Sequence, residues 1–271
     1  MANLAYFHPQ DNVAGTATLT IGAGTEDPDY PRANLYDLNP TRPMRFTTKV
    51  GAVVFDWTTP QQVDAVLLPH HNLDAGLEVR WQMHTADVWT SPDVNQAFTI
   101  PAWDEDGFPP SVWLDLATLV PVAANRTKRY GRFVVVGTNS VNVAIGELPI
   151  YQTKRELAPR NITYPLRVRE VRPRREQQTD YLVRTIYDLG TKLRELETQT
   201  RTTITAGVAQ LRSWYRACKG PALMTAIVPD QSANLALLVR WTTDVFEHEE
   251  TFLEVANVSL TWREESRGLP L

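Results

Sequence analysis

The residues best suited to chemistry in this chain of 271 residues are a histidine pair and an acidic loop. His70 and His71 are adjacent, so on a strand their side chains would point to opposite faces and could not bind one metal ion. A turn at His71–Leu73 is the better interpretation.

Three consecutive acids, Asp104–Asp106, lie within Trp103–Gly107. Glycoside hydrolysis needs two carboxylates at a defined separation, and a calcium loop needs alternating oxygen ligands and a closing Glu. We interpret the segment as a solvated loop tip, with a bound cation or a glycoside-cleaving site as alternatives.

The sequence offers no activated nucleophile. It contains no G-x-S-x-G motif and no glycine-rich phosphate loop. The single cysteine, Cys218, excludes an intrachain disulfide and a cysteine metal cluster, and it falls on the apolar side of a predicted helix, where a buried thiol is usual. We therefore predict no catalytic residue, no cofactor, no metal ion and no enzyme activity.

Tryptophan offers a binding chemistry. Four of the 8 tryptophans lie close together in the first half of the chain, at Trp81, Trp89, Trp103 and Trp113. An indole can stack on a sugar ring, although a tryptophan in a β-sandwich more often fills a core or an interface. Pro, Asp and Gly surround Trp89 and Trp103 and indicate loops, so these two are the candidate glycan contacts.

The segments that would position these residues are predicted strands. Short runs of β-branched and aromatic residues, bounded by Gly, Pro, Asn and Asp, predict six of them before residue 150: Thr16–Ile21, Val53–Trp57, Ala65–Leu68, Leu77–Met83, Phe133–Val136 and Val141–Leu148. No long helical period interrupts them. A succession of strands without crossover helices predicts a β-sandwich or jelly roll.

Three motifs in this half carry a resemblance. Pro31–Leu35 reads P-x-x-N-L, Val63–Leu73 ends in HNL, and Ile145–Leu148 reads IGEL. In this order they resemble the galactose-binding-like jelly roll that occurs as a module in structural proteins of tailed phages. The resemblance implies a jelly-roll domain over residues 1–155, a fold class that often binds carbohydrate at its loops.

The second half has one predicted helix, at about residues 206–219. Thr205 is a suitable N-cap, and Gly220-Pro221 ends the helix. The apolar stripe contains Val208, Leu211, Tyr215 and Cys218. The flanking strands are predicted at Leu166–Val171, Tyr181–Asp188, Leu193–Thr203, Leu223–Val228, Ala236–Trp241 and Phe252–Trp262. Residues 156–271 thus read as a second β-sandwich with one packed helix.

This half resembles another phage family. Trp214–Gly220, Ile227–Asp230, Val239–Trp241 and Leu260–Glu265 follow the order seen in distal-tail and minor-tail proteins of phages. These proteins use a tail-tube-like β-sandwich to build rings around the tail axis. The resemblance implies contacts with copies of itself, as a trimer or hexamer, and with tube, hub and tape-measure proteins.

Charge is distributed unevenly along the chain. Residues 1–150 hold 9 basic and 16 acidic residues, a balance of −7, whereas the rest hold 18 and 15, a balance of +3. A basic stretch, residues 156–175, joins the halves. It is either a solvated linker, an arm that docks on the acidic half of a neighbouring copy, or a nucleic-acid contact; the last is disfavoured because the whole chain is acidic. The candidate arm residues are Arg160, Arg167, Arg169, Arg172, Arg174 and Arg175.

These features together predict a mainly β protein of two β-sandwich domains that forms a ring in a phage tail tip or baseplate. The chain has no apolar run long enough for a membrane helix, and its start lacks a signal-peptide pattern. We therefore expect synthesis in the host cytoplasm and a place in the virion tail. The alternative function is recognition of host surface glycans by the jelly roll, and a glycoside-cleaving enzyme is the third.

Overall fold

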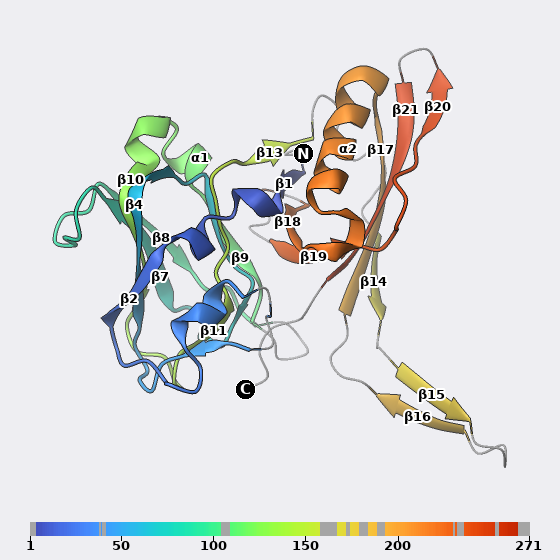
Figure 1. The fold of residues 1–271 in the computed structure, drawn as a ribbon. Coiled ribbons are helices and arrows are strands. Elements are labelled where there is room, and N and C mark those ends of the chain that lie inside the picture. The colour runs from blue at the N-terminus through green and yellow to red at the C-terminus, as the bar shows by residue number, and fades with distance from the viewer. Residues whose placement is uncertain are drawn as a thin grey trace. The chain divides into compact units, whose positions relative to one another are not determined.

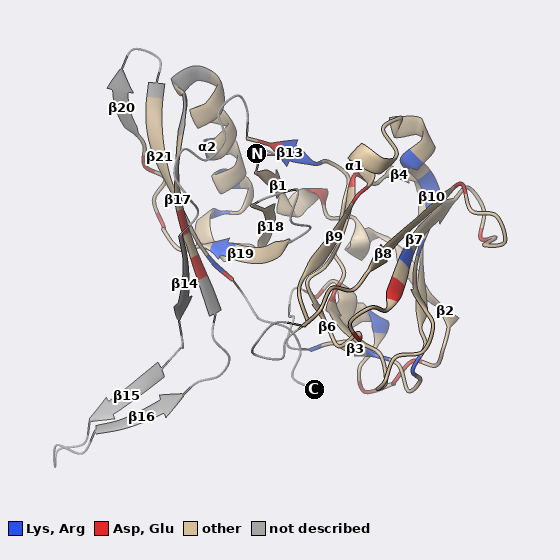
Figure 2. Ribbon diagram, turned by 180° about the vertical axis from the view of Figure 1, so that it is seen from behind, with Lys and Arg blue, Asp and Glu red and all other residues tan. Residues whose placement is uncertain are grey.

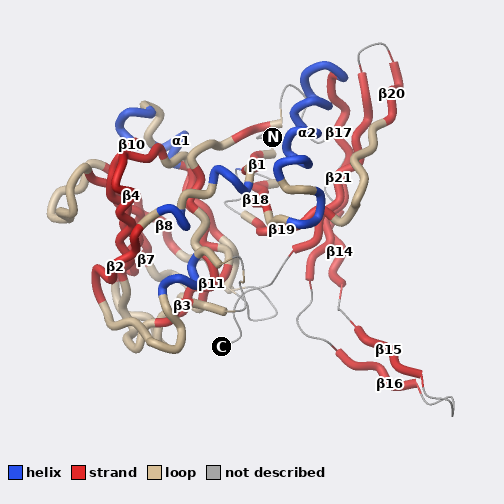
Figure 3. The backbone as a smooth tube through the Cα atoms, viewed as in Figure 1, coloured by secondary structure: helices blue, strands red, loops and turns tan. Residues whose placement is uncertain are grey.

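A computed structural model of the chain folds into two compact units (Figure 1). The first comprises residues 1–157, 225–237 and 268–271, and the second comprises residues 158–224 and 238–267. The structure describes residues 4–37, 39, 42–103, 109–157, 167–171, 174–178, 184–188, 193–229, 231, 236–252 and 255–264. Strands dominate both units (Figure 3).

The first unit is built on a five-stranded antiparallel sheet. Its order is β2 (Thr18–Ala23), β4 (Ala52–Gln62), β10 (Thr127–Val136), β7 (Glu78–His84) and β8 (Val94–Thr99). Side chains alternate between the two faces along each strand. In β10, for example, Gly131, Phe133 and Val135 are buried, while Arg132 and Val134 between them are half-buried.

Two three-stranded sheets oppose the buried face of this sheet. One has the order β3 (Met44–Arg45), β11 (Ala144–Glu147) and β6 (His70–His71). The other has the order β12 (Ile150–Tyr151), β5 (Ala65–Leu68) and β9 (Val112–Asp115). A single hydrophobic core contains side chains from all three sheets, which makes this part of the unit a β-sandwich of the jelly-roll class.

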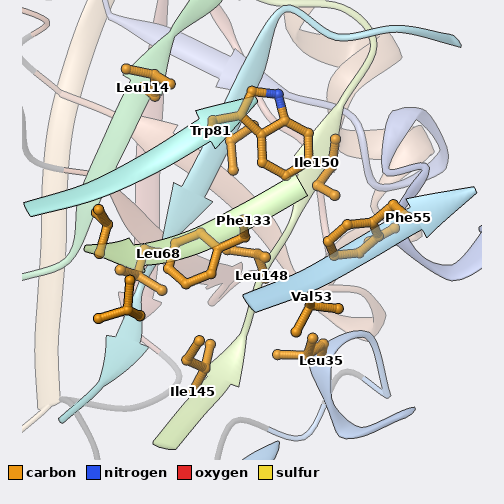
Figure 4. Packing of buried hydrophobic residues seen from close by; sticks show 14 of the residues in the cluster. Leu35, Val53, Phe55, Leu68, Trp81, Leu114, Phe133, Ile145, Leu148 and Ile150 are labelled. Atoms are coloured by element: carbon orange, nitrogen blue, oxygen red, sulfur yellow. The ribbon is translucent and has the colours of Figure 1, made fainter. Parts of the chain in front are cut away.

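The core is closely packed around aromatic side chains. Phe55, Trp81 and Phe133 project from the five-stranded sheet toward aliphatic residues that include Leu68 and Ile150 (Figure 4). All five of these side chains are at most 1% exposed. Burial of this apolar surface is the main stabilising contribution of the unit.

Shorter elements complete the first unit. β1 (Ala5–Phe7) pairs with β13 (Arg155–Glu156) on one side and with β18 (Thr225–Val228) on the other. The helical segments are α1 (Leu116–Leu119) and four 3₁₀ turns at Pro9–Asp11, Ala14–Thr16, Arg32–Leu35 and Ala123–Arg126. The chain therefore returns to this unit after residue 224 to add a strand beside its own beginning.

The second unit is a sheet with one helix packed on it. The strands β14 (Arg167–Val171), β17 (Leu193–Thr203), β21 (Val255–Glu264) and β19 (Leu237–Trp241) are neighbours in this order, and β20 (Glu249–Phe252) also pairs with β21. A separate two-stranded ribbon consists of β15 (Arg174–Gln178) and β16 (Arg184–Asp188).

The helix α2 (Ala209–Ala217) follows a π-helical turn at Ile204–Val208. The predicted N-cap, Thr205, is wrong, because the side chain of Thr203 accepts the hydrogen bond from the backbone N–H of Gly207. Trp214, rather than the predicted Tyr215, is the fully buried aromatic residue of the helix. Its ring centroid lies 5.0 Å from that of Trp241 and 5.6 Å from that of Trp262. After α2, a 3₁₀ turn occupies Gly220–Ala222.

The predicted mainly β class, with a jelly-roll sandwich first and a single packed helix later, is confirmed. The predicted turn beginning at His71 is wrong, since His70 and His71 form β6 and pair with β11. Several short strands lack a sequence signal, among them β1, β3 and β12. They are only two or three residues long, and tertiary pairing rather than local pattern decides them.

Candidate functional site

The two candidate glycan contacts lie at opposite ends of strand β8. Trp89 lies in the loop that joins β7 to β8, and Trp103 follows the end of β8. Because β8 has six residues at about 3.3 Å per residue, the two loops lie roughly 20 Å apart. A single sugar ring cannot contact both indoles, so the structure separates the two residues that the sequence analysis grouped.

Trp103 connects loops of the jelly roll. Its indole Nε1 donates a hydrogen bond to the carbonyl oxygen of Leu73, at 3.0 Å, and the residue is half-buried. This bond joins the segment after β8 to the segment after β6. The polar edge of Trp103 is therefore used within the protein, and the acids Asp104–Asp106 lie outside the described residues.

Trp89 has a different environment. It is half-buried within an exposed loop, next to Val88, which is 50% exposed. Its Nε1 donates a hydrogen bond of 2.7 Å to Oδ1 of Asp87. The guanidinium carbon of Arg132 lies 5.6 Å from the centroid of the indole, within the range of a cation–π interaction. The loop therefore places an aromatic ring beside a cation from another strand.

Arg132 belongs to a row of residues on the outer face of the five-stranded sheet. The row crosses all five strands in register, from Thr20 through Val54, Arg132 and Gln82 to Asn95. The amide of Gln82 donates to Oδ1 of Asn95 at 3.2 Å. Its carbonyl oxygen lies 3.5 Å from Nη1 of Arg132, at the weak limit of a hydrogen bond.

Arg132 differs from the other basic residues of β7 and β10, whose positions are coloured in Figure 2. Each of the others is in an ion pair: Arg80 with Glu78, Lys128 with Asp93, and Arg129 with Asp56. Among the residues that the structure describes, Arg132 has no carboxylate within ion-pair distance. Burial lowers the pKa of Arg132, and the charge of Asp87 partly offsets this.

Arg132 and Asp87 carry no signal in the sequence that would identify them as part of a site. The alternation of β10 predicts that Arg132 points away from the core, but it does not reveal what lies next to it. The contact with Trp89 depends on the register between β7 and β10. Residues far apart in sequence meet here through strand pairing, which short-range pattern does not determine.

His71 has a structural role. His71 is fully buried, and its Nδ1 accepts a hydrogen bond of 3.1 Å from the backbone N–H of Leu73. Nε2 therefore carries the proton and donates it to the carbonyl oxygen of Pro110, also at 3.1 Å. Burial lowers the pKa of His71 to about 4, so the ring is neutral near pH 7. Within the described part of the chain, no group of three or more His, Cys, Asp or Glu residues could hold a metal ion.

The candidate basic arm is divided among several elements. Arg167 and Arg169 belong to β14, where they lie opposite Glu197 and Glu195 of β17. Arg174 and Arg175 belong to β15, whereas Arg160 and Arg172 lie outside the described residues. The arm's role between subunits stays a prediction.

Cys218 is buried at the end of α2.

No protein-family model matches the chain, and no curated protein is significantly similar to it. Its similarity to solved structures is weak. "CpGH89CBM32-6 produced by Clostridium perfringens" is 17% identical with a TM-score of 0.35, over 52% of this chain and 99% of that chain. Chitosan-binding module 1 of a chitosanase/glucanase from Paenibacillus sp. IK-5 is 18% identical with a TM-score of 0.36, over 52% and 98%.

A third similar structure is the lectin domain of lectinolysin complexed with Lewis B antigen. It is 12% identical with a TM-score of 0.38, over 52% of this chain and 96% of that chain. TM-scores below 0.5 carry no information about the function of this chain. No helix within the described residues is long and apolar enough to cross a membrane.

Proposed function

We propose that the first unit is a non-catalytic glycan-binding module that binds sugar at the Trp89 end of its five-stranded sheet. The observation that supports this is the cluster of Trp89, Asp87 and Arg132 on the outer face. None of these three residues belongs to the hydrophobic core formed by the described residues of the unit. A sugar ring offers apolar C–H faces for stacking and hydroxyl groups for hydrogen bonds. An indole beside polar and charged side chains matches both needs.

The arrangement of Trp89 is suited to binding. The hydrogen bond to Asp87 fixes the orientation of the indole, and the neighbouring guanidinium restrains it further. A ring that is already held in place loses little conformational entropy when a ligand binds, which raises affinity. Trp103, with its Nε1 bonded to Leu73, is the less suitable of the two candidates.

Glycan binding is tested with Trp89→Ala on a glycan array, followed by isothermal titration with the glycan that binds best. We expect an affinity loss of about tenfold or more, the usual effect of removing a central aromatic contact. Val88→Ala, which removes the exposed neighbour in the same loop, is the matched control and keeps the affinity. Unchanged binding by Trp89→Ala, or equal losses in both variants, would contradict the proposal.

A second candidate is the ring-forming role in a phage tail tip or baseplate. The observation that favours it is the ribbon of β15 and β16, which pairs with no other strand among the described residues. A two-stranded ribbon is marginally stable by itself, and its free edges can pair with another chain. The ribbon carries Arg174 and Arg175 of the candidate arm. A trimer or hexamer in contact with tube, hub and tape-measure proteins would place the protein in the virion tail.

The ring hypothesis is tested by measuring the mass of the protein by light scattering and imaging it by electron microscopy. It predicts closed rings, and it predicts that replacing residues 174–188 by a glycine–serine linker of equal length abolishes them. A protein that stays monomeric at high concentration, alone and with isolated tail tubes, contradicts this candidate. Glycan binding by the first unit is independent of that result.

A further inference from the structure

Several N–H groups of Arg132 have no acceptor among the residues that the structure describes. A guanidinium carries five N–H groups. Within the described part of the chain, the hydrogen bond of Arg132 is the 3.5 Å contact from Nη1 to Oε1 of Gln82. Nε is buried without a partner among the described residues, and Nη2 has no partner there either. Arginines in partly buried positions normally pair with carboxylates, as Arg129 does with both carboxylate oxygens of Asp56 at 2.9 Å.

The guanidinium is nevertheless held in place. The indole of Trp89 lies on one side of it. On the sheet side it lies close to Gly22, where an added Cβ would come within 3.4 Å of Nε and within 3.1 Å of a methyl group of Val54. Arg132 is therefore placed between Trp89 and the sheet near Gly22, at the surface where we propose that sugar binds.

The first half of the chain as a whole is acidic, so it does not attract anions in general. The first 150 residues have a formal balance of −7, which repels polyanions that make no specific contact. Asp87, whose charge acts on Arg132, accepts a hydrogen bond from Nε1 of Trp89. An anion would bind only where its negative group reaches the unpaired guanidinium directly.

We propose that the Trp89 site is specific for sugars that carry a carboxylate, namely uronic acids, and that Arg132 binds the carboxylate. This inference rests on the proposed glycan function and names the ligand class. The planar fork of the guanidinium matches the two oxygens of a carboxylate, while Trp89 provides a surface for the pyranose ring. The carboxylate of the ligand would form an ion pair with Arg132, as a carboxylate of the protein does with each other basic residue of β7 and β10.

The experiment uses the full chain and matched ligands. The acidic ligand is an unesterified oligogalacturonide, and the neutral ligand is the same oligomer with its carboxylates methyl-esterified. A sulfated dextran of similar size tests for general attraction to polyanions. Affinities are measured by isothermal titration at about 0.15 M salt, where interactions between distant charges are screened.

Three variants identify the residue responsible. Arg132→Gln removes the cation, and Arg132→Lys keeps the charge without the planar fork. Arg80→Gln is the matched control, because Arg80 lies on the same face but is paired with Glu78. The wild type should bind the acidic oligomer at least about tenfold more tightly than the ester. Arg132→Gln should lose about tenfold or more, as expected when a charged partner is removed, Arg132→Lys should lose less, and Arg80→Gln should retain the affinity.

The outcomes separate the two proposals. Equal affinity for the acid and the ester, with both lost in Trp89→Ala, overturns the uronate inference and leaves glycan binding standing. No binding to any sugar on the array overturns the proposed function itself. Equal losses in Arg132→Gln and Arg80→Gln, or tighter binding of sulfated dextran than of the oligogalacturonide, also overturn the inference. Circular dichroism of each variant establishes that the fold is retained.

Discussion

The two faces of the five-stranded sheet use the same strands for different purposes. The inner face carries Phe55, Trp81 and Phe133, which are at most 1% exposed and pack against the opposing sheets. The outer face carries Arg132, Gln82 and Asn95 in one row, with Trp89 beside it. On the inner face each side chain packs against its neighbours, whereas on the outer face Arg132 has no ion-pair partner among the described residues. The buried aromatic residues concentrate the stabilising contacts on the inner face, and the recognition that we propose would use the outer face.

The largest expected effect is the loss of an inner-face tryptophan. Trp81 is fully buried, and its ring lies 5.8 Å from that of Phe55 and 6.5 Å from that of Trp57. Trp81→Ala should lower the free energy of unfolding by about 3–5 kcal/mol, since it removes buried surface and leaves a cavity. Urea unfolding followed by circular dichroism measures this. Trp89→Ala is the control from the outer side and should change it by less than about 1 kcal/mol. Similar losses of unfolding free energy in both variants would contradict the view that the inner face contributes most of the stability.

The next effect concerns pH and a buried group of the opposing sheet. The folded state lowers the pKa of His71 from 6.5 to about 4. Below pH 6.5 the unfolded chain takes up a proton that the folded protein does not bind until about pH 4. The stability contribution is therefore fully present above pH 6.5 and is lost as the pH falls toward 4. The total loss is about 3 kcal/mol for a shift of this size.

This pH dependence is measured as the free energy of unfolding between pH 7 and pH 4. In His71→Gln the protein is less stable at pH 7, but its stability should fall less steeply over this interval, because one titrating group is gone. The surface carboxylates Asp56 and Asp93 titrate equally in both proteins. If the two curves run parallel, His71 does not control the acid sensitivity.

A third effect tests how tightly the inner face is packed. Gly131 lies between two tryptophans, and an added Cβ would approach Trp57 to 2.6 Å and Trp81 to 2.8 Å. Gly131→Ala should therefore cost about 1–3 kcal/mol of stability through overpacking. Gly76→Ala is not a suitable control because Gly76 has a φ of +82°. Ala97→Gly, on the outer face of β8, tests an exposed position instead. A more stable Gly131→Ala protein would show that the core has space that the structure does not indicate.

The sequence predicted the buried strands of the first unit better than the outer face of the five-stranded sheet. Runs such as Val53–Trp57 and Ala65–Leu68 have the composition of buried strands, and β4 and β5 include both of them. The polar beginning of β10, from Thr127, was not predicted, because its outward residues do not resemble a strand core. Trp89 and Trp103 were correctly assigned to loops. Their separation along β8 and the approach of Arg132 to Trp89 follow from strand register, which local residue patterns do not encode.

The smallest expected effect on stability belongs to the residue with the largest proposed role in binding. Arg132 has one weak hydrogen bond and no ion pair among the described residues, and its Nε is buried without a partner. Arg132→Gln should therefore change the free energy of unfolding by no more than about 0.5 kcal/mol, because little favourable interaction is lost and a desolvated charge is removed.

Arg80→Gln gives the comparison on the same face, since it breaks a surface ion pair with Glu78 that contributes about 0–1 kcal/mol. Urea unfolding of both variants without any sugar measures the difference. A loss above about 2 kcal/mol in Arg132→Gln would make Arg132 a structural residue, and its unused donors would then no longer indicate a site for a ligand. A loss of stability near zero, together with weakened binding of the acidic oligomer, would show that Arg132 contributes to binding and not to the stability of the fold.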